Sequence, residues 1–351
     1  EFAKVLFYVY CFLVSINLMG SAFKLSGEGF AETLLRTTSN PFSGLFIGLF
    51  VTSIIQSSST TTSIIVAIVG SGTLSIKNAI PMIMGANIGT TVTNTIISFG
   101  CLNRKTDFER AFCAGIVHDM FNIYATIILF PLELYTGLLY RSALFMEKIF
   151  EGIGGFKFVS PLKIIVNPIS EPVATFIDNY VILLIVSLVC LFFSLSGIVK
   201  NMKGIVMQKV ERVLNQYLFR NAFISLLFGM FFTALVQSSS ITTSIIIPLV
   251  GAGLLTIEQI FPYTLGANLG TTITAILAAL TLGEGAGMAI ALAHLLFNMF
   301  GISIIYPIKK LPILTAKKIA GYVSKSKKHF FIFIFIYILI HFAPVILTFL
   351  N

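Results

Sequence analysis

The sequence predicts an all-α polytopic membrane protein with two inverted-topology repeats, each with a re-entrant helical hairpin that carries a Gln-Ser-Ser-Ser motif. Composition is the first reason, because 56% of the 351 residues are hydrophobic, 11% are charged, and the mean hydropathy is +0.96. Soluble globular domains lie far from these values. The second reason is an internal duplication, and the third is that each copy of the motif lies within a long apolar stretch.

Several apolar runs are long enough to form membrane helices. An α-helix needs about 20 mainly apolar residues to cross a bilayer. Five runs approach or exceed this length, near residues 3–24, 110–134, 179–199, 287–306 and 330–350. The net charge of +9 comes from lysines and arginines that concentrate in a few segments. Such clusters indicate which segments face the cytoplasm, and they do not indicate a nucleic-acid partner.

The chain contains two copies of one unit. Residues 56–75 align with residues 237–256 at an offset of 181, and 13 of the 20 positions are identical. The same offset relates Gly-Ala-Asn-Ile-Gly-Thr-Thr at 85–91 to Gly-Ala-Asn-Leu-Gly-Thr-Thr at 266–272. A further match, at an offset of 176, relates His118, Phe121 and Asn122 to His294, Phe297 and Asn298.

Each motif is expected at the tip of a re-entrant hairpin, at about 41–72 and 222–253. The apolar arms of the first hairpin, 43–55 and 64–70, are too short to cross a hydrocarbon core of about 30 Å at 1.5 Å per residue. A hairpin whose tip reaches the middle of the membrane accommodates both arms. Its non-helical turn is tolerated where it is buried in protein or lines a watery cavity.

The charge distribution predicts opposite orientations for the two repeats. Basic residues concentrate in 104–110, 200–220 and 309–328, and such segments face the cytoplasm. The first hairpin then opens from the outside and the second from the inside. Inverted repeats with paired broken segments are a recurrent plan of secondary transporters, with the binding site at the midplane.

The predicted organisation has five parts, of which the charge-balanced connection between the repeats is expected to be extracellular. The parts are a first repeat at 1–134, a connecting loop at 135–178, a second repeat at 179–308, a basic interfacial helix at 309–328 and a C-terminal membrane helix at 329–351.

The hairpin tips offer hydroxyl and amide groups but no charge. A helix that restarts at the serines presents free backbone N–H groups and a positive dipole end to an oxyanion. Side-chain oxygens of Ser, Thr, Gln and Asn suit an alkali cation. Since 43–70 and 222–253 contain no Lys, Arg, Asp or Glu, a multiply charged anion would be costly to bind alone. The composition of the tips therefore favours cation–anion symport over an anion uniporter.

Other polar residues and the cysteines carry weaker signals. The polar residues within or at the ends of the apolar runs are functional candidates: His118, Asp119, Asn122, Glu133 and His294. For the two histidines, hydrogen bonding between helices and proton coupling both stay open. The cysteines match no metal-binding spacing and are expected to be buried small hydrophobes: Cys11, Cys101, Cys113 and Cys190.

The sequence resembles the type II sodium–phosphate cotransporter family in five stretches: QSSSTTTSIIVAIVGSG, IPMIMGANIGTTVTNTI, TDFERAF with HDMFN, VQSSSITTSIIIPLVGAG and PYTLGANLGTTITAILAAL. The resemblance covers roughly 41–134 and 222–322. It implies sodium-coupled import of inorganic phosphate by alternating access, with phosphate and Na⁺ bound at mid-membrane. The connection at 135–178 has no cysteine and no Asn-x-Ser/Thr site, which departs from the vertebrate members and indicates a compact bacterial-type member in the plasma (inner) membrane.

The resemblance also implies the ligands. The phosphate ligands are Gln56, Ser57, Ser58, Ser59, Gln237, Ser238, Ser239 and Ser240. The ligands of Na⁺, the co-transported ion, are Gln56, Ser59, Thr62, Asn87, Thr90, Gln237, Ser240, Thr243, Asn268 and Thr271. The alternative for the Gly-Ala-Asn segments is ordinary packing of membrane helices through small residues.

Other functions stay open at this point. A symporter of another oxyanion, such as sulfate or arsenate, would use a similar site. A channel or sensor would use the fold without coupling. A serine hydrolase is disfavoured because no Gly-x-Ser-x-Gly elbow is present. The expected partners are phosphate, sodium ions and membrane lipids, and a monomer and a dimer are both compatible with the sequence.

Overall fold

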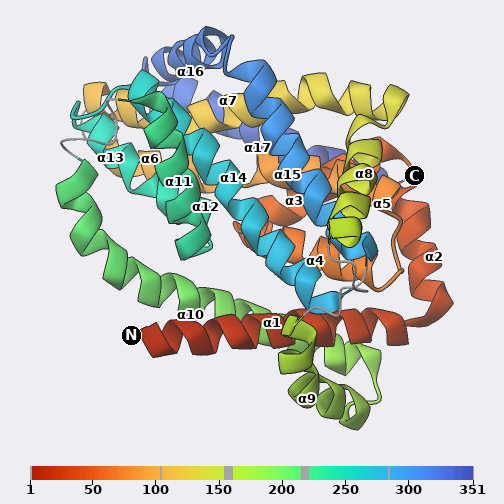
Figure 1. Cartoon of the computed structure of the whole chain (residues 1–351). Helices are drawn as coiled ribbons and strands as arrows, with labels where there is room; N and C mark the ends of the chain where they lie inside the picture. The colour runs from red at the N-terminus through yellow and green to blue at the C-terminus, as the bar shows by residue number, and fades with distance from the viewer. Residues whose placement is uncertain (1, 103–104, 154–160, 215–220, 284, 351) are drawn as a thin grey trace.

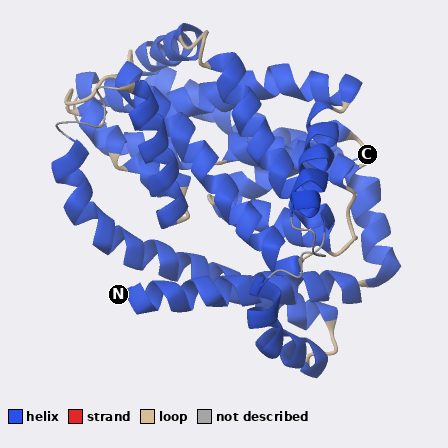
Figure 2. Ribbon diagram, viewed as in Figure 1, coloured by secondary structure: helices blue, strands red, loops and turns tan. Residues whose placement is uncertain are grey.

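The computed structural model describes residues 2–102, 105–153, 161–214, 221–283 and 285–350, and these residues form helices joined by short turns (Figures 1 and 2). No strand occurs among them. This agrees with the predicted all-α class. Basic residues within 103–104 and 215–220, on which part of the predicted orientation depends, lie outside the described residues.

The helices follow one another in two similar series. In the first half they are α1 (Phe2–Leu25), α2 (Gly27–Thr38), α3 (Pro41–Ile55), α4 (Ser58–Gly70), α5 (Ile76–Gly89), α6 (Val92–Ser98), the short 3₁₀ helix η1 (Phe99–Cys101) and α7 (Lys105–Thr136). In the second half they are α8 (Leu138–Ile153), α9 (Pro161–Phe176), α10 (Tyr180–Leu214), α11 (Ala222–Val236), α12 (Ser239–Ser244), α13 (Ile246–Gly251), α14 (Ile257–Leu282), α15 (Gly285–Ile305), α16 (Lys310–Val323) and α17 (Lys327–Leu350).

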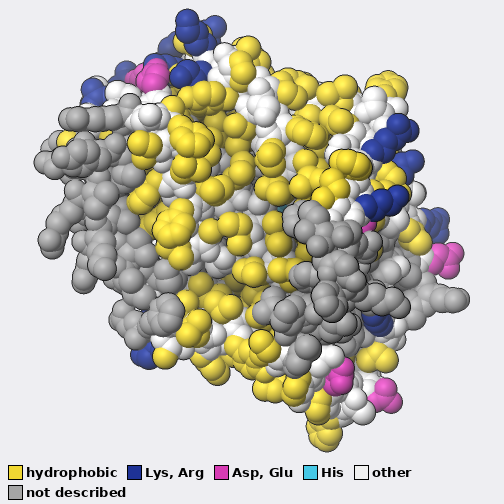
Figure 3. Space-filling view, viewed as in Figure 1, with side chains coloured by type: hydrophobic (Ala, Val, Ile, Leu, Met, Phe, Trp, Pro, Cys, Tyr) yellow, Lys and Arg dark blue, Asp and Glu magenta, His cyan; other side chains and the backbone are white. Residues whose placement is uncertain are grey.

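Five helices of the described chain are long and apolar enough to cross a membrane. They are Ala3–Leu25, Lys105–Thr136, Tyr180–Ile198, Ile257–Leu282 and Gly285–Ile305. Hydrophobic side chains also cover much of the visible face of the molecule (Figure 3). These features are those of a multi-pass membrane protein.

The connection between the repeats contains two helices rather than an open loop. α8 and α9 both lie within 135–178, and residues 154–160 between them are outside the described part. The charge balance of 135–178 predicts its side of the membrane and carries no information on secondary structure, whereas both segments have the helical spacing of apolar residues. Glu133 has a structural role here, because its carboxylate accepts hydrogen bonds from the backbone N–H groups of Leu139 (2.6 Å) and Tyr140 (3.3 Å). It thereby caps the start of α8 after the turn at Gly137.

The predicted basic helix forms as α16, and lysines gather over it at the top of Figure 3. Lys317 pairs with Glu258 at the start of α14, with Nζ and Oε1 2.7 Å apart. Ser324 donates a hydrogen bond to Glu109 of α7 (3.2 Å). α16 is therefore fastened to two long helices, and the chain continues from it into α17.

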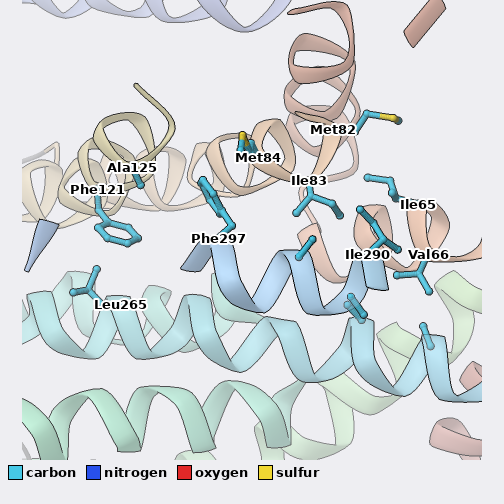
Figure 4. Packing of buried hydrophobic residues seen from close by; sticks show 14 of the residues in the cluster. Ile65, Val66, Met82, Ile83, Met84, Phe121, Ala125, Leu265, Ile290 and Phe297 are labelled. Carbon is cyan, nitrogen blue, oxygen red and sulfur yellow. The ribbon is translucent and has the colours of Figure 1, made fainter. Parts of the chain in front are cut away.

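One hydrophobic core joins helices from both halves of the chain. Figure 4 shows Phe121 of α7 directed toward Leu265 of α14, with Phe297 of α15 beside them. Ile65 of α4 and Ile290 of α15 belong to the same buried cluster. All four cysteines are free, and Cys113 is buried in this core, whereas Cys11, Cys101 and Cys190, which were also expected to be buried, are partly exposed. α1 and α10 lie side by side along the bottom of Figure 1.

Glycines bring two pairs of helices into backbone contact. A Cβ atom added at Gly85 of α5 would collide with the carbonyl oxygen of Leu45 on α3. One added at Gly266 of α14 would collide with the carbonyl oxygen of Leu226 on α11. The partners are related by the same offset of 181, so both copies of the unit share this contact. Small residues at helix crossings are the usual means of close packing in membrane proteins.

Substitution of this glycine is expected to destabilise the protein. Gly85→Ala forces α3 and α5 apart, because the new methyl group meets backbone rather than a movable side chain. Overpacking of this kind costs about 1–3 kcal/mol. The melting temperature of the purified protein in detergent measures the effect. Gly100→Ala is the control, since a Cβ atom there would meet no heavy atom of the described residues within 4 Å, its chain neighbours aside. Equal melting temperatures for the two variants would contradict the prediction.

Candidate functional site

Each Gln-Ser-Ser-Ser motif interrupts a helix through the same two backbone conformations. Gln56 (φ 55°, ψ 28°) and Gln237 (φ 57°, ψ 25°) are left-handed, and they are the only non-glycine residues with positive φ in the described part of the chain. The following serines, Ser57 (φ −145°) and Ser238 (φ −152°), are extended. Left-handed backbone costs free energy for a residue with a Cβ atom, and such strain is found mostly at functional sites.

The serine after each break caps the helix that follows. The Oγ atom of Ser57 accepts a hydrogen bond from the backbone N–H of Thr60 (3.2 Å), and that of Ser238 accepts one from Ile241 (3.3 Å). α4 therefore restarts at Ser58, as α12 restarts at Ser239. The predicted restart of a helix at the serines is thus present in both copies.

The two motifs touch each other although they lie far apart in the sequence. Ser59 donates a hydrogen bond from Oγ to the carbonyl oxygen of Gln237 over 3.0 Å. Both side chains are buried, as are Ser58, Ser239 and Ser240. The structure thus brings two of the predicted phosphate-ligand groups into one cluster of hydroxyls and backbone groups.

The two glutamines have different surroundings. Gln237 is buried, and its Oε1 accepts a hydrogen bond from Thr274 of α14 (2.6 Å). The side chain of Gln56 is exposed. Thr93, which corresponds to Thr274, has a buried Oγ1 without a hydrogen-bond partner among the described residues. The second motif is therefore tied to its neighbouring helix through a contact that the first motif lacks.

Four predicted sodium ligands are threonines whose hydroxyls bond to their own helices; Thr243 donates to the carbonyl oxygen of Ser239 (2.8 Å). Thr62 donates to the carbonyl oxygen of Ser58 (2.8 Å), Thr90 to that of Ala86 (2.9 Å), and Thr271 to that of Asn268 (2.6 Å). A hydroxyl in this arrangement still has lone pairs for a cation. The helix also breaks at Thr90–Thr91, between α5 and α6, whereas α14 runs unbroken through the corresponding position.

The two predicted asparagine ligands contact histidines of the opposite repeat. His118 Nε2 lies 2.5 Å from Oδ1 of Asn268, and His294 Nε2 lies 3.4 Å from Oδ1 of Asn87. All four side chains are buried. The pairing is reciprocal, because each histidine reaches the Gly-Ala-Asn segment of the other copy. The two histidines thus form hydrogen bonds between helices of the two repeats.

Asn94 is a site residue that sequence reasoning missed. It lies on α6, and its Oδ1 accepts a hydrogen bond from Thr243 beside the second motif (2.7 Å). Its Nδ2 lies 3.3 Å from His118 Nδ1. The second repeat has Ala275 at the corresponding position, so the search for duplicated polar residues passed over it. Its signal is the polar Thr-Asn-Thr sequence within an apolar stretch.

Asp119 is a buried acidic residue that follows His118 directly in the sequence. Its Oδ1 accepts a hydrogen bond from Thr91, at the break between α5 and α6, over 2.6 Å. No group of three or more His, Cys, Asp or Glu side chains suited to a metal occurs in the described residues. Hydroxyl and amide oxygens are hard, neutral ligands that suit an alkali cation, and backbone N–H groups suit an oxyanion.

Comparison with known proteins agrees with the motifs. The sequence pattern described as Na⁺/Pi-cotransporter matches residues 11–140 and 190–311. The chain belongs to this family. The family membership predicted from the five sequence stretches is therefore confirmed. Because the family consists of cotransporters, the expectation that the protein is not an enzyme is confirmed as well.

Three mammalian proteins illustrate the similarity. The chain is 33% identical to sodium-dependent phosphate transport protein 2A of Ovis aries over 92% of its own length, and 34% identical to that of Rattus norvegicus over 91%. It is 32% identical to sodium-dependent phosphate transport protein 2B of Homo sapiens over 97% of its length. The chain spans 64%, 63% and 63% of these relatives, respectively. No solved structure matches it.

The strained turn predicts an unusual response to glycine. Gln56→Gly is expected to stabilise the protein by about 0.5–1 kcal/mol, because glycine adopts positive φ without a steric penalty. Gln56→Ala, which keeps the strain and removes the polar end of the side chain, is the matched control and is expected to bring no gain. Thermal unfolding in detergent compares the two. A glycine variant that melts no higher than the alanine variant would show that the turn is unstrained.

Proposed function

We propose that the protein is a sodium-coupled secondary transporter that imports inorganic phosphate by alternating access. The observation that carries this proposal is the contact between the two motifs, in which Ser59 Oγ lies 3.0 Å from the carbonyl oxygen of Gln237. A cluster built equally from two repeats suits a site that opens to either side of the membrane. The names of the mammalian relatives, which are sodium-dependent phosphate transport proteins, support the choice of substrates.

Phosphate is proposed to bind between the restarted helices α4 and α12. The first-turn N–H groups of α4 and the serine hydroxyls of both motifs are neutral donors for its oxygens. The proposed ligands are Gln56, Ser57, Ser58, Ser59, Gln237, Ser238, Ser239 and Ser240.

Sodium is proposed to bind beside phosphate through neutral oxygens. Because the motif segments have no fixed charge, the anion and the cations compensate each other in a medium of low dielectric constant. This mutual dependence is a physical basis for coupling. The proposed ligands are Gln56, Ser59, Thr62, Asn87, Thr90, Gln237, Ser240, Thr243, Asn268 and Thr271.

The two broken segments are proposed to be re-entrant hairpins in inverted repeats. α3 and α11 have 15 residues each, which corresponds to about 22 Å at 1.5 Å per residue, short of a hydrocarbon core of about 30 Å. The repeated turn, cap and glycine contact support a common ancestor for the two units. The protein is proposed to lie in the plasma membrane, which in a bacterium is the inner membrane.

Transport in proteoliposomes tests the function. With an inward Na⁺ gradient, the purified protein is expected to accumulate radiolabelled phosphate, and with K⁺ in place of Na⁺ it is expected not to. Excess unlabelled sulfate and arsenate test selectivity. Uptake that ignores the Na⁺ gradient would indicate a channel or uniporter, and inserted protein that carries sulfate but not phosphate would indicate a different oxyanion symporter.

Removal of one serine hydroxyl is expected to impair transport without loss of folding. Ser239→Ala deletes a donor to a charged ligand, a contact worth about 1.5–3 kcal/mol, so uptake is expected to fall at least about tenfold. Ser303→Ala is the control, because that exposed hydroxyl bonds only to Met299 of its own helix among the described contacts. Equal uptake by both variants at equal insertion would remove Ser239 from the site.

A further inference from the structure

A chain of buried hydrogen bonds begins at the second motif segment. The hydroxyl of Thr243 donates to Oδ1 of Asn94 (2.7 Å), and Nδ2 of Asn94 lies 3.3 Å from Nδ1 of His118. All three side chains are at most 1% exposed. The chain thus leads from α12, in the second repeat, through α6 to α7 in the first.

The same chain continues across the interface between the repeats. His118 Nε2 lies 2.5 Å from Oδ1 of Asn268, and Nδ2 of Asn268 donates to Oδ1 of Asn122 (2.7 Å). Nδ2 of Asn122 then donates to the carbonyl oxygen of Asn87 (2.8 Å). Five hydrogen bonds in series therefore connect Thr243 to both Gly-Ala-Asn segments.

The last acceptor determines the direction of every bond in the chain. The carbonyl oxygen of Asn87 can only accept, so Asn122 must turn its amide N–H toward it and its Oδ1 toward Asn268. Asn268 then offers Oδ1 to His118, which must carry its proton on Nε2 and accept at Nδ1. Asn94 consequently turns Nδ2 to the imidazole and Oδ1 to Thr243.

In this direction the hydroxyl proton of Thr243 is shared between Oδ1 of Asn94 (2.7 Å) and the carbonyl oxygen of Ser239 (2.8 Å), and Asn94 draws it away from its own helix. The oxygen lone pairs of Thr243 are then directed away from the bond and are available to a cation, which a hydroxyl can bind only through its oxygen. A chain in which all donors point one way is also polarised cooperatively in a low-dielectric interior. Asn94 therefore controls how Thr243 presents its oxygen.

The first motif segment has no equivalent chain. Ala275 stands at the position that corresponds to Asn94. Among the described contacts, Thr62, which corresponds to Thr243, donates within its own helix alone, whereas Thr243 donates both within its helix and to Asn94. His294 Nδ1 and Asn298 Oδ1 are buried without a hydrogen-bond partner among the described residues. Among the described residues, this chain of hydrogen bonds therefore serves the second motif segment and not the first.

We propose that Asn94 is a positioning residue, held by His118, that orients the hydroxyl of Thr243 for the co-transported Na⁺. The inference rests on the proposed sodium coupling. Loss of the Asn94 amide frees Thr243 to donate solely to Ser239 of its own helix, whose carbonyl oxygen is 2.8 Å away. The Thr243 oxygen is then misoriented, and its affinity for Na⁺ falls while the fold persists.

A double-mutant cycle tests this role. The variants are Asn94→Ala, Thr243→Val and the double variant, and the readout is the Na⁺ concentration that half-saturates the rise in melting temperature of purified protein, with total salt kept constant by K⁺. Asn94→Ala is expected to raise this concentration about threefold to tenfold, and Thr243→Val about tenfold. The double variant is expected to match Thr243→Val alone, because coupled residues are non-additive.

Two further variants separate orientation from packing. Thr243→Ser keeps the donor to Asn94 and is expected to stay within about twofold of wild type. Thr126→Val deletes a buried hydroxyl of α7 that has no hydrogen-bond partner among the described residues, and it is likewise expected to have little effect. A loss in Thr243→Ser equal to that in Thr243→Val would assign the role to the methyl group and overturn the inference.

The outcomes also distinguish this inference from the proposed function. A double variant whose effect is the product of the two single effects would overturn the role of Asn94 and leave sodium coupling intact. A wild-type protein that responds to Na⁺ but carries no phosphate would overturn the substrate and leave the role of Asn94 standing. A wild-type protein without any specific response to Na⁺ would overturn both.

Discussion

Polar groups inside this apolar protein must be satisfied by other protein groups, and the arrangement of the site follows from that constraint. A break in a helix exposes N–H and C=O groups that hydrocarbon cannot solvate. At both breaks, a serine side chain caps the next helix and the two broken segments contact each other through Ser59 and Gln237. The contact between the repeats thus satisfies one carbonyl group that the second break exposes. The proposed binding of a pair of opposite ions would use the remaining donors and oxygens of the two breaks.

The two halves of the duplicated motif region differ in their contacts. Gln237 is buried against Thr274, while Gln56 is exposed. His118 forms a short contact with Asn268, while the mirror contact of His294 with Asn87 is longer. Part of this difference is written in the sequence, because Asn94 corresponds to Ala275. Two equal halves have therefore diverged at the residues that support the site more than in the motif itself.

Much of the fold could be predicted, since it depends on patterns that survive in one dimension. Apolar length predicts α1, α7, α10, α15 and α17 but not α14, whose apolar run is interrupted by polar residues such as Asn268 and Thr271. The repeated motif predicts two similar interruptions. The two helices within 135–178 were missed because charge alone was used there. Which histidine reaches which asparagine could not be predicted, because the exchange of partners between the repeats is a property of their packing. Asn94 could not be predicted either, because the second repeat has Ala275 at the corresponding position and the duplication therefore gives no signal there.

The glycine contacts described for α3 with α5 and α11 with α14 have a mechanical consequence. Backbones in direct contact cannot slide past each other without a clash, so each pair of helices behaves as one rigid unit. Any rearrangement that exposes the centre of the molecule first to one side and then to the other would have to occur between these rigid pairs and the helices packed against them. α7 and α15 contact these pairs through His118 with Asn268 and through His294 with Asn87, and such hydrogen bonds can be exchanged one at a time.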